Sequence, residues 1–333
     1  MSDMADDRRE PWTIIRLLEW TRGFFASKGI DDARLEAELL LAHALGTERV
    51  QLYAQHDRVL AEPELSAFRG LVRRRAQRVP TQYLLGKAHF RNLTLKVTPA
   101  VLIPRPETEL LVDEALELLV PRRKPAWEFA RGEFRDRRDG PDEGAPELID
   151  TGAPRPPARP RVLDLCTGCG CIALAIASEC PAATVVATDV SADALAVARE
   201  NAEGCGLADR VTLLEGDLFA ALDALPEAER AFDLITANPP YVSEAELRTL
   251  MPEVRDHEPR AALVAGPTGF ECVDRIVAEA PRYLAEGGAL LVEIGYAQAG
   301  GVRERLATVS DWDLAGIRRD LCGHERIVHL RRV

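Results

Sequence analysis

The sequence has 333 residues and lacks any long run of apolar residues. No stretch approaches the roughly 18 uncharged apolar residues that a membrane-spanning helix needs, so we expect no membrane association. The first residues, MSDMADDRREPW, also lack the basic start and apolar core of a secretory signal. These two absences predict a cytoplasmic protein.

Cysteine is absent from the first 165 residues, and the chain as a whole has no excess of basic residues. All seven cysteines come later, and an odd number crowded into one part of a chain does not indicate a disulfide framework. The 42 basic residues are outnumbered by 54 acidic ones, which gives a net charge of −12. A protein that binds nucleic acid through its phosphates usually has a basic face, so we expect no direct nucleic-acid recognition.

The first part of the chain, residues 1–80, is predicted to form a small helical bundle. Apolar residues recur at helical spacing in three segments, 12–18, 35–42 and 62–78. Gly29 and Gly46 are natural helix ends. The run Arg73-Arg74-Arg75 is interpreted as a solvated helix face, and a contact for an acidic or RNA-bound partner is the weaker alternative. Because no catalytic motif occurs here, we expect a module that docks a partner or positions a substrate.

Two segments of different composition follow the helical region. Residues 81–103 are predicted to form a hairpin-like linker, because residues 90–97 alternate in polarity around a turn at Arg91-Asn92. Pro106 suits the first turn of a helix that ends near Leu119. Residues 121–160 hold eight of the 22 prolines, with many charges and little apolar periodicity, and are predicted to be a flexible insertion without an assigned function.

From Arg161 onward, strands alternate with helices, which is typical of a doubly wound α/β sheet. The predicted strands are 161–165, 184–188, 210–214, 232–237, 288–294, 313–319 and 326–332. The predicted helices are 171–179, 192–203, 270–285 and 298–307. The last two strands have no helix between them. We therefore expect a seven-stranded, mostly parallel sheet with an antiparallel terminal hairpin at one edge.

Three strand ends carry residues that suit one ligand. The first strand runs into the turn Cys166-Thr167-Gly168-Cys169-Gly170, where glycine allows a positive φ and a close backbone approach. Asp164 suits a cationic amino-acid tail better than a pyrophosphate, and Asp189 can accept from both ribose hydroxyls. Asp217 could meet an adenine edge. Ligands of open α/β sheets bind at carboxyl strand ends, so this pattern predicts S-adenosyl-L-methionine (AdoMet) as cofactor.

The spacing of Cys166, Cys169 and Cys171 has a second interpretation as a metal or redox site. No second cysteine pair stands nearby at zinc spacing, and no histidine is close in sequence. Small residues are also what a tight turn requires. We therefore interpret these thiols as packing groups and expect no metal.

The segment Asn238-Pro239-Pro240-Tyr241 follows a buried strand and indicates the chemistry. The Asn238 side-chain oxygen and the Pro239 carbonyl can both accept from one planar NH2 group, and Tyr241 can cover its flat face. Such a site recognises an amide or exocyclic amino nitrogen. That nitrogen needs orientation and favourable hydrogen bonds more than a strong base. Asn238, Pro239 and Tyr241 are therefore the predicted catalytic residues.

Together with this motif, the segments PTQYLLG (80–86), VLIPRPETE (101–109) and PEVRDHEPR (252–260) resemble the glutamine-amide methyltransferases of class-1 peptide chain release factors. The Asn-Pro-Pro-Tyr element alone is shared with adenine-N6 DNA and guanine-N2 RNA methyltransferases. Methyltransferases of a ribosomal-protein glutamine are the nearest alternative, but they resemble this chain less at Arg105–Glu109. A non-enzymatic AdoMet-binding scaffold is disfavoured by the intact motif.

The resemblance implies a class I, Rossmann-like methyltransferase domain over 104–333 and a release-factor-docking domain over 1–80. The enzyme would methylate the glutamine of a Gly-Gly-Gln motif, leave S-adenosyl-L-homocysteine as product and act as a monomer. Residues 166–170, Asp189, Asp217 and Leu218 would line AdoMet, and Asn238 would touch both cofactor and substrate. Residues 238–241, Arg105 and Glu107 would hold the glutamine.

Two positions depart from the family pattern. Cys166 stands where the family commonly has glycine, and because its side chain restricts φ we expect an ordinary backbone conformation there. Leu218 stands where the family often has an aromatic residue, so we expect weaker stacking on adenine.

Overall fold

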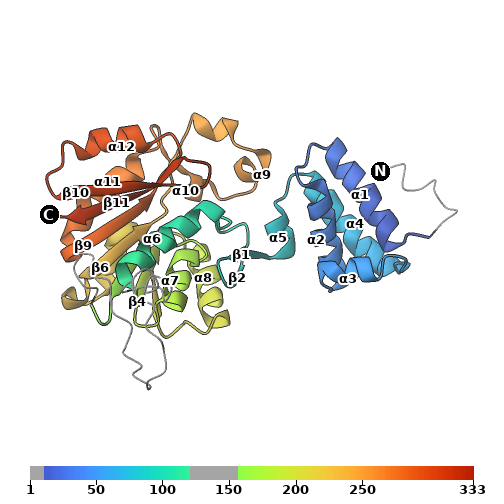
Figure 1. Ribbon diagram of the computed structural model, residues 1–333, viewed down its shortest axis with the longest axis horizontal. Coiled ribbons are helices and arrows are strands. Elements are labelled where there is room, and N and C mark those ends of the chain that lie inside the picture. The colour runs from blue at the N-terminus through green and yellow to red at the C-terminus, as the bar shows by residue number, and fades with distance from the viewer. Residues whose placement is uncertain (1–10, 121–156) are drawn as a thin grey trace, which may run out of the picture.

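The computed structural model describes residues 11–120 and 157–333. A helical domain and an α/β domain lie side by side, joined through a short helix and a hairpin (Figure 1). Apart from residues 157–160, the predicted insertion 121–160 lies outside the described residues. Within the described ranges, no helix is both long and apolar enough to cross a membrane.

The helical domain confirms the three predicted helices and adds two short ones. Its elements are α1 (Ile14–Ser27), α2 (Ala33–Leu45), α3 (Arg49–Ala54), α4 (Glu62–Ala76) and α5 (Thr81–Leu85). Leu17, Leu40 and Phe68 meet in one apolar core. Gly46 caps α2 in the left-handed conformation, as its predicted role as a helix end requires. The two short helices were missed because five or six residues are too few to show a helical period.

The arginine run in α4 is only partly the solvated face that we predicted. Arg73 and Arg74 are exposed, but Arg75 is buried and bonds to Glu36 and Glu253. Successive residues of a helix point about 100° apart, so three in a row cannot share one face. Arg75 therefore faces the α/β domain, where Glu253 lies.

The predicted hairpin follows α5, as β1 (Lys87–Phe90) and β2 (Leu93–Lys96) in antiparallel pairing. Arg91 takes φ 50° at its turn. After the hairpin, the 3-10 turn η1 (Pro106–Thr108) leads into α6 (Glu109–Leu119), which confirms the predicted helix. Pro106 is the first residue of the 3-10 turn that precedes α6.

The α/β domain contains the predicted seven-stranded sheet, in the order β10-β11-β9-β6-β3-β4-β5. The strands are β3 (Arg161–Leu165), β4 (Thr184–Asp189), β5 (Val211–Glu215), β6 (Phe232–Ala237), β9 (Leu284–Glu293), β10 (Trp312–Arg319) and β11 (Glu325–Arg332). The pairs among β5, β4, β3, β6 and β9 are parallel, whereas β11 is antiparallel to both neighbours. The terminal hairpin lies at the edge, as expected.

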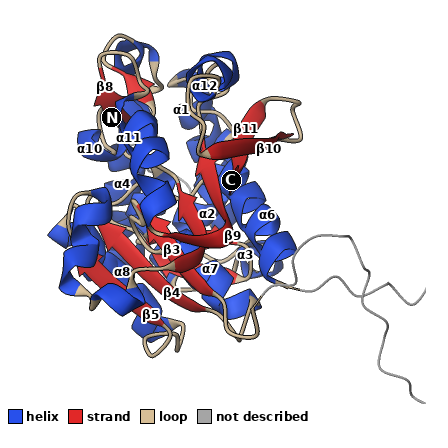
Figure 2. Cartoon of the chain, turned by 90° about the vertical axis from the view of Figure 1, so that its left-hand side faces the viewer, coloured by secondary structure: helices blue, strands red, loops and turns tan. Residues whose placement is uncertain are grey.

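Helices cover both faces of the sheet, as Figure 2 shows. One face packs against α6, α7 (Cys171–Glu179), α8 (Ala192–Gly204) and the β1–β2 hairpin. The other packs against η3 (Leu218–Ala224), α11 (Glu271–Glu279) and α12 (Ala299–Leu306). Parallel strands buried on both faces are mostly apolar, as β3 (RVLDL) and β6 (FDLITA) are, which explains why both could be recognised from the sequence.

A segment of small elements lies between β6 and α11. It comprises β7 (Val242–Ser243), η5 (Glu246–Thr249), α9 (Pro252–Arg255), α10 (Arg260–Leu263) and β8 (Val264–Gly266). β7 and β8 pair in parallel as a separate two-stranded sheet. The segment starts at the carboxyl end of β6 and therefore builds over that edge of the main sheet.

Two neighbouring predicted boundaries, the end of a helix and the start of the next strand, were wrong. The helix expected over 270–285 ends as α11 at Glu279 and continues only as the 3-10 turn η6 (Ala280–Arg282). Pro281 lacks the N–H that a continuing α-helix would use. Strand β9 then begins at Leu284, four residues earlier than expected, and its pairing with β6 contains a register irregularity.

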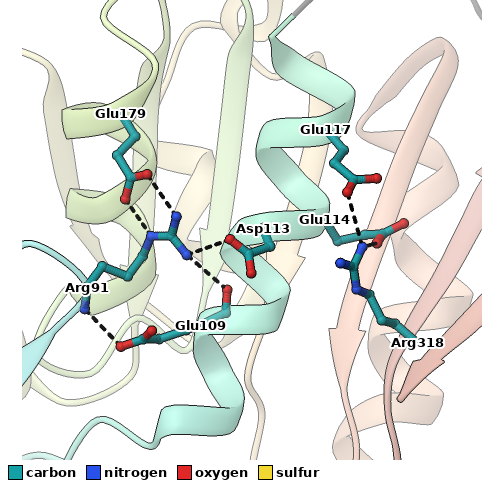
Figure 3. Close-up of polar contacts among 7 residues, drawn as sticks. All are labelled: Arg91, Glu109, Asp113, Glu114, Glu117, Glu179 and Arg318. Atoms are coloured by element: carbon teal, nitrogen blue, oxygen red, sulfur yellow. Dashed lines mark hydrogen bonds and ion pairs between the residues drawn. The ribbon is translucent and has the colours of Figure 1, made fainter. Parts of the chain in front are cut away.

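The hairpin is tied to the α/β domain by a partly buried arginine network (Figure 3). The Arg91 guanidinium donates to both carboxylate oxygens of Glu179 and, at 2.7 Å, to Asp113. Its backbone N–H donates to the Glu109 carboxylate at 2.9 Å. One side chain thus joins the hairpin to α6 and α7.

We predict that Arg91→Ala lowers the free energy of unfolding by about 2 kcal/mol or more, since it leaves carboxylates of two helices without their shared cation. Arg318→Ala is the matched control, because Arg318 also bonds to two α6 carboxylates but its side chain is 36% exposed. This control should lose less than about 1 kcal/mol. Urea denaturation measures both losses, and equal losses would contradict the prediction.

Candidate active site

The carboxyl ends of the central strands border a cavity of about 210 Å³. Most of the residues predicted to bind cofactor or substrate line it: Arg105, Cys166, Thr167, Gly168, Cys169, Asp189, Asp217, Leu218, Asn238 and Pro240. Five predicted residues do not line it: Asp164, Gly170, Glu107, Pro239 and Tyr241. The turn after β3, the end of β4 and the Asn-Pro-Pro-Tyr segment therefore share one cavity.

The turn after β3 uses left-handed backbone at three positions. Gly168 and Gly170 have φ 56° and 84°, as the motif predicted. The expectation of an ordinary conformation at Cys166 was wrong, because this residue has φ 57°. Single non-glycine residues tolerate this at a cost of about 1 kcal/mol. Two hydrogen bonds to β4 hold the turn in this conformation. Thr167 N–H donates to Thr188 O at 3.0 Å, and Gly168 N–H donates to the Asp189 carboxylate at 2.9 Å.

Asp164 lies behind this turn and not on the cavity wall. It is fully buried, and its two oxygens accept from Thr167 Oγ1 at 2.6 Å and Thr236 Oγ1 at 2.9 Å. Burial raises the pKa of Asp164 to about 7. The carboxyl group therefore braces the turn from inside, and its predicted contact with a cationic tail stays a prediction.

Asp189 ends β4 and lines the cavity directly. One carboxylate oxygen accepts from Gly168 N–H and the other from Ser191 N–H, both at 2.9 Å. Burial raises the pKa of Asp189. Each carboxylate oxygen has a second lone pair, so the fixed group can still accept from a ligand hydroxyl.

Asp217 and Leu218 line the cavity after β5. The Asp217 carboxylate pairs with Arg275 at 2.8 Å, and both side chains are about half exposed. Leu218 is buried and takes φ 51°. An apolar side chain there offers a surface for a flat ring.

Asn238 follows β6 and is fixed by a residue that the sequence analysis did not select. Its Nδ2 donates to Thr108 Oγ1 at 3.2 Å. Thr108 is 1% exposed and belongs to η1. With Nδ2 engaged, Asn238 Oδ1 remains as the acceptor at the cavity wall.

Tyr241 is held beside the cavity by Gln298. The Gln298 Nε2 donates to Tyr241 O at 3.0 Å and Gly269 O at 2.9 Å, while its Oε1 accepts from Gly295 N–H at 2.8 Å. Burial raises the pKa of the Tyr241 hydroxyl, so this group stays protonated. Gln298 thus anchors the end of the Asn-Pro-Pro-Tyr segment, and the predicted stacking of Tyr241 on substrate stays a prediction.

Arg105 reaches the cavity from the other specific motif. Its Nη2 donates to Glu258 Oε1 at 2.6 Å, and Glu258 Oε2 accepts from Ile103 N–H at 3.3 Å. Burial raises the pKa of Glu258, whereas the charge of Arg105 opposes that rise. Glu107 stands nearby, half-buried, without a place on the cavity wall.

Besides Glu258, a second buried acid lies near Arg105 and Glu107 and was not predicted as a site residue. Glu293 ends β9 and is 1% exposed, and burial raises its pKa to about 7. The rule that selected Asp189, an acidic residue at a carboxyl strand end, could have found it.

The cysteine cluster gives no sign of a metal centre. In the parts of the chain that the structure describes, no three His, Cys, Asp or Glu side chains are grouped to hold a metal ion. Cys169 is buried in the apolar cluster on one face of the sheet, with Cys171 half-buried against it, and Cys166 is half-buried against the cluster on the other face. The expected absence of a metal stays a prediction.

Comparison with known proteins decides the family. Residues 16–86 match the PrmC N-terminal domain, and residues 137–254 match the methyltransferase small domain. A release factor glutamine methyltransferase of Rhodopirellula baltica is 39% identical over 332 residues and is covered completely, as is this chain. The chain belongs to this family.

Other members of the family give the same assignment. The Geobacter sulfurreducens release factor glutamine methyltransferase is 44% identical, with 88% of each chain covered. The Homo sapiens MTRF1L release factor glutamine methyltransferase is 33% identical, over 96% of this chain and 88% of its own. The protein is thus a methyltransferase, which confirms the resemblance found in the motifs.

We predict that Gly170→Ala destabilises the fold by about 1–2 kcal/mol, because an L-residue is strained at its φ of 84°. A Cβ there would also lie 3.2 Å from Leu174 Cδ1. Gly204→Ala is the control, since Gly204 ends α8 and a Cβ there has no neighbour within 4 Å. It should leave stability unchanged or raise it by up to about 1 kcal/mol. Thermal unfolding compares them, and an unaffected Gly170→Ala protein would contradict the assigned strain.

Proposed function

We propose that the enzyme transfers the methyl group of AdoMet to the side-chain amide nitrogen of the glutamine in the Gly-Gly-Gln motif of class-1 release factors. One observation carries this proposal. Asn238, the candidate amide acceptor, lines the same cavity as Gly168 and Asp189, the candidate donor site. A bound methyl donor and an incoming amide would therefore meet at the end of β6.

The cavity wall fits AdoMet in its chemistry. Asp189 offers acceptors for ribose hydroxyls, and Leu218 offers an apolar surface for adenine. Gly168 brings backbone close to the ligand without a side chain in between. AdoMet, when bound, supplies a methyl group already activated by a sulfonium leaving group, so the residues of the chain need only bind and orient.

The work of the protein is then to present the amide nitrogen. Asn238 Oδ1 and the Pro239 carbonyl accept from the two N–H groups, which orients the nitrogen lone pair toward the cavity. The lone pair of an amide is delocalised, so hydrogen bonds that favour a pyramidal nitrogen are stronger in the transition state than in the ground state. The surplus proton leaves to water after transfer.

We assign release-factor docking to the helical domain, with its boundary at residue 80. A small apolar recess between α1 and α4 supports this assignment, because Trp20, Phe24 and Val72 line it beside the cations Arg69 and Arg73. Aromatic residues and arginine are enriched at protein interfaces. A monomeric, cytoplasmic protein without direct nucleic-acid recognition stays our prediction.

A ribosomal-protein glutamine is the alternative acceptor, because the same amide geometry would serve it. The two acceptors are separated by incubating the full chain with labelled AdoMet and either purified release factor or ribosomal protein. Mass spectrometry then locates the added methyl group. Label on the Gly-Gly-Gln glutamine supports the proposal, and label only on the ribosomal protein would contradict it.

We predict that Asn238→Ala lowers kcat for release-factor methylation by about 100-fold or more, since it removes one of two acceptors that orient the amide. The fold should persist because Asn238 is only half-buried. The control is Asn92→Ala, which changes an exposed asparagine in the hairpin turn. Steady-state kinetics with a circular dichroism check would test this, and near-normal turnover of Asn238→Ala would refute the role.

A further inference from the structure

We infer that Glu293 and Thr108 are positioning residues that set the orientation of the Asn238 amide, and that Glu293 does so only when it is ionised. The inference rests on the proposed function, because it concerns how the amide acceptor is presented. Thr108 lines the cavity beside Asn238, whereas Glu293 does not. Both act through the Asn238 side chain.

Strand register brings Glu293 to Asn238. In the parallel pair of β6 and β9, Ala237 lies opposite Val292. The next residues are Asn238, which follows β6, and Glu293, which ends β9, so these two residues lie side by side. Thr108 enters from η1, and its Oγ1 accepts from Asn238 Nδ2 at 3.2 Å.

Thr108 is also the hydrogen-bonding partner of the Glu293 carboxyl group, on which it acts to lower the pKa. Thr108 and Glu293 are each 1% exposed, so water does not compete for these contacts. Among the described residues, Glu293 Oε2 has no hydrogen-bond partner. Burying a carboxyl group with one oxygen unsatisfied is costly for stability and is typical of functional sites.

Proton counting fixes the direction of each bond. A carboxylate can only accept, so an ionised Glu293 takes the single hydroxyl proton of Thr108. Thr108 can then only accept from Asn238, which must present Nδ2 to it. Asn238 Oδ1 is thereby left for the substrate amide, as the reaction requires.

Protonation of Glu293 removes this constraint. The carboxylic acid can donate to Thr108, and the Thr108 proton can then turn to Asn238 Oδ1. The Asn238 side-chain amide would then rotate and point its Nδ2 at the substrate NH2 group. Because both groups are donors, no hydrogen bond can form between them. Activity should therefore be lost as the pH falls through the pKa of Glu293.

The charges around Glu293 come from several elements. Arg326 on β11 and Arg105 before η1 lower its pKa, while Glu107 in η1 raises it. Tyr241 and Cys171 also face it, and the negative charge of Glu293 raises the pKa of both. Burial is the largest effect and places the pKa at about 7.

The test measures kcat against pH, at saturating AdoMet and release factor, for wild type, Glu293→Gln, Thr108→Val and Thr108→Ser. Wild-type kcat should rise about tenfold as the pH increases through 7. Glu293→Gln should lose this step and stay at least about tenfold lower at pH 8, with unchanged or higher thermal stability. Thr108→Val should lose the pH step and have the same lower kcat, whereas Thr108→Ser, which keeps the hydroxyl, should keep both near their wild-type values.

Thr21→Val is the matched control for Thr108→Val. Thr21 is fully buried in α1, and its hydroxyl has no hydrogen-bond partner within the described ranges. This control should keep the wild-type kcat and pH step. AdoMet affinity, measured by calorimetry, should stay within about twofold in every variant, because Gly168, Asp189 and Leu218, which line the candidate cofactor site, are unchanged.

Two outcomes would overturn the inference separately from the proposed function. If wild type methylates the glutamine but Glu293→Gln keeps the wild-type kcat and pH step, Glu293 does not orient Asn238, and the proposed function stands. A step that persists in Glu293→Gln would instead belong to another buried acid such as Asp164. If wild type fails to methylate any release factor, the proposed function fails, and the inferred role of Glu293 and Thr108 fails with it.

Discussion

The parallel pairing of β3 with its two neighbours is the constraint on which the site depends. Leu165, the last residue of β3, lies opposite Thr188 on β4 and Ala237 on β6. The chain leaves all three strands at the same level, which brings Cys166, Asp189 and Asn238 to one cavity. Because the backbone hydrogen bonds of the sheet set this register, no single side chain has to bring these groups together.

Polar side chains then fix what the sheet brings together. Asp189 holds the turn after β3, Gln298 holds the end of the Asn-Pro-Pro-Tyr segment, and Thr108 holds Asn238. Asp189 and Gln298 bond to backbone groups, and Thr108 bonds to the Asn238 side chain, so the geometry is set before any ligand arrives. Such preorganisation suits a reaction in which orientation is the main contribution of the protein.

The segment 252–260 connects this site with the helical domain. Glu253 accepts from Arg75 and Arg78 at 3.0 Å each, and His257 Nε2 donates to the Gln77 carbonyl at 3.1 Å. Glu258, five residues after Glu253, bonds to Arg105 at the cavity. The helical domain and the cavity are thus joined by one short stretch of chain.

The strand-end rule recovered most of the site from the sequence, but it could not tell which groups face the cavity. Asp164 obeys the rule and yet points into the interior, where two threonines satisfy it. Glu293 obeys it too, but its importance appears only through Thr108, which comes from a distant part of the chain. Cys166 was assigned an ordinary backbone because intrinsic preference disfavours a positive φ, and the hydrogen bonds of the turn override that preference.

The sequence by itself determined the α/β alternation, the terminal hairpin, the helical first domain and the motifs that name the family. These features follow from local periodicity, glycine and proline placement, and residue order, all of which a linear chain displays. Only the tertiary structure decided the burial of Arg75, the orientation of Asn238 and the raised pKa of Glu293. Each of these depends on groups that are far apart in sequence and adjacent in space, because burial and hydrogen bonding are properties of the folded neighbourhood.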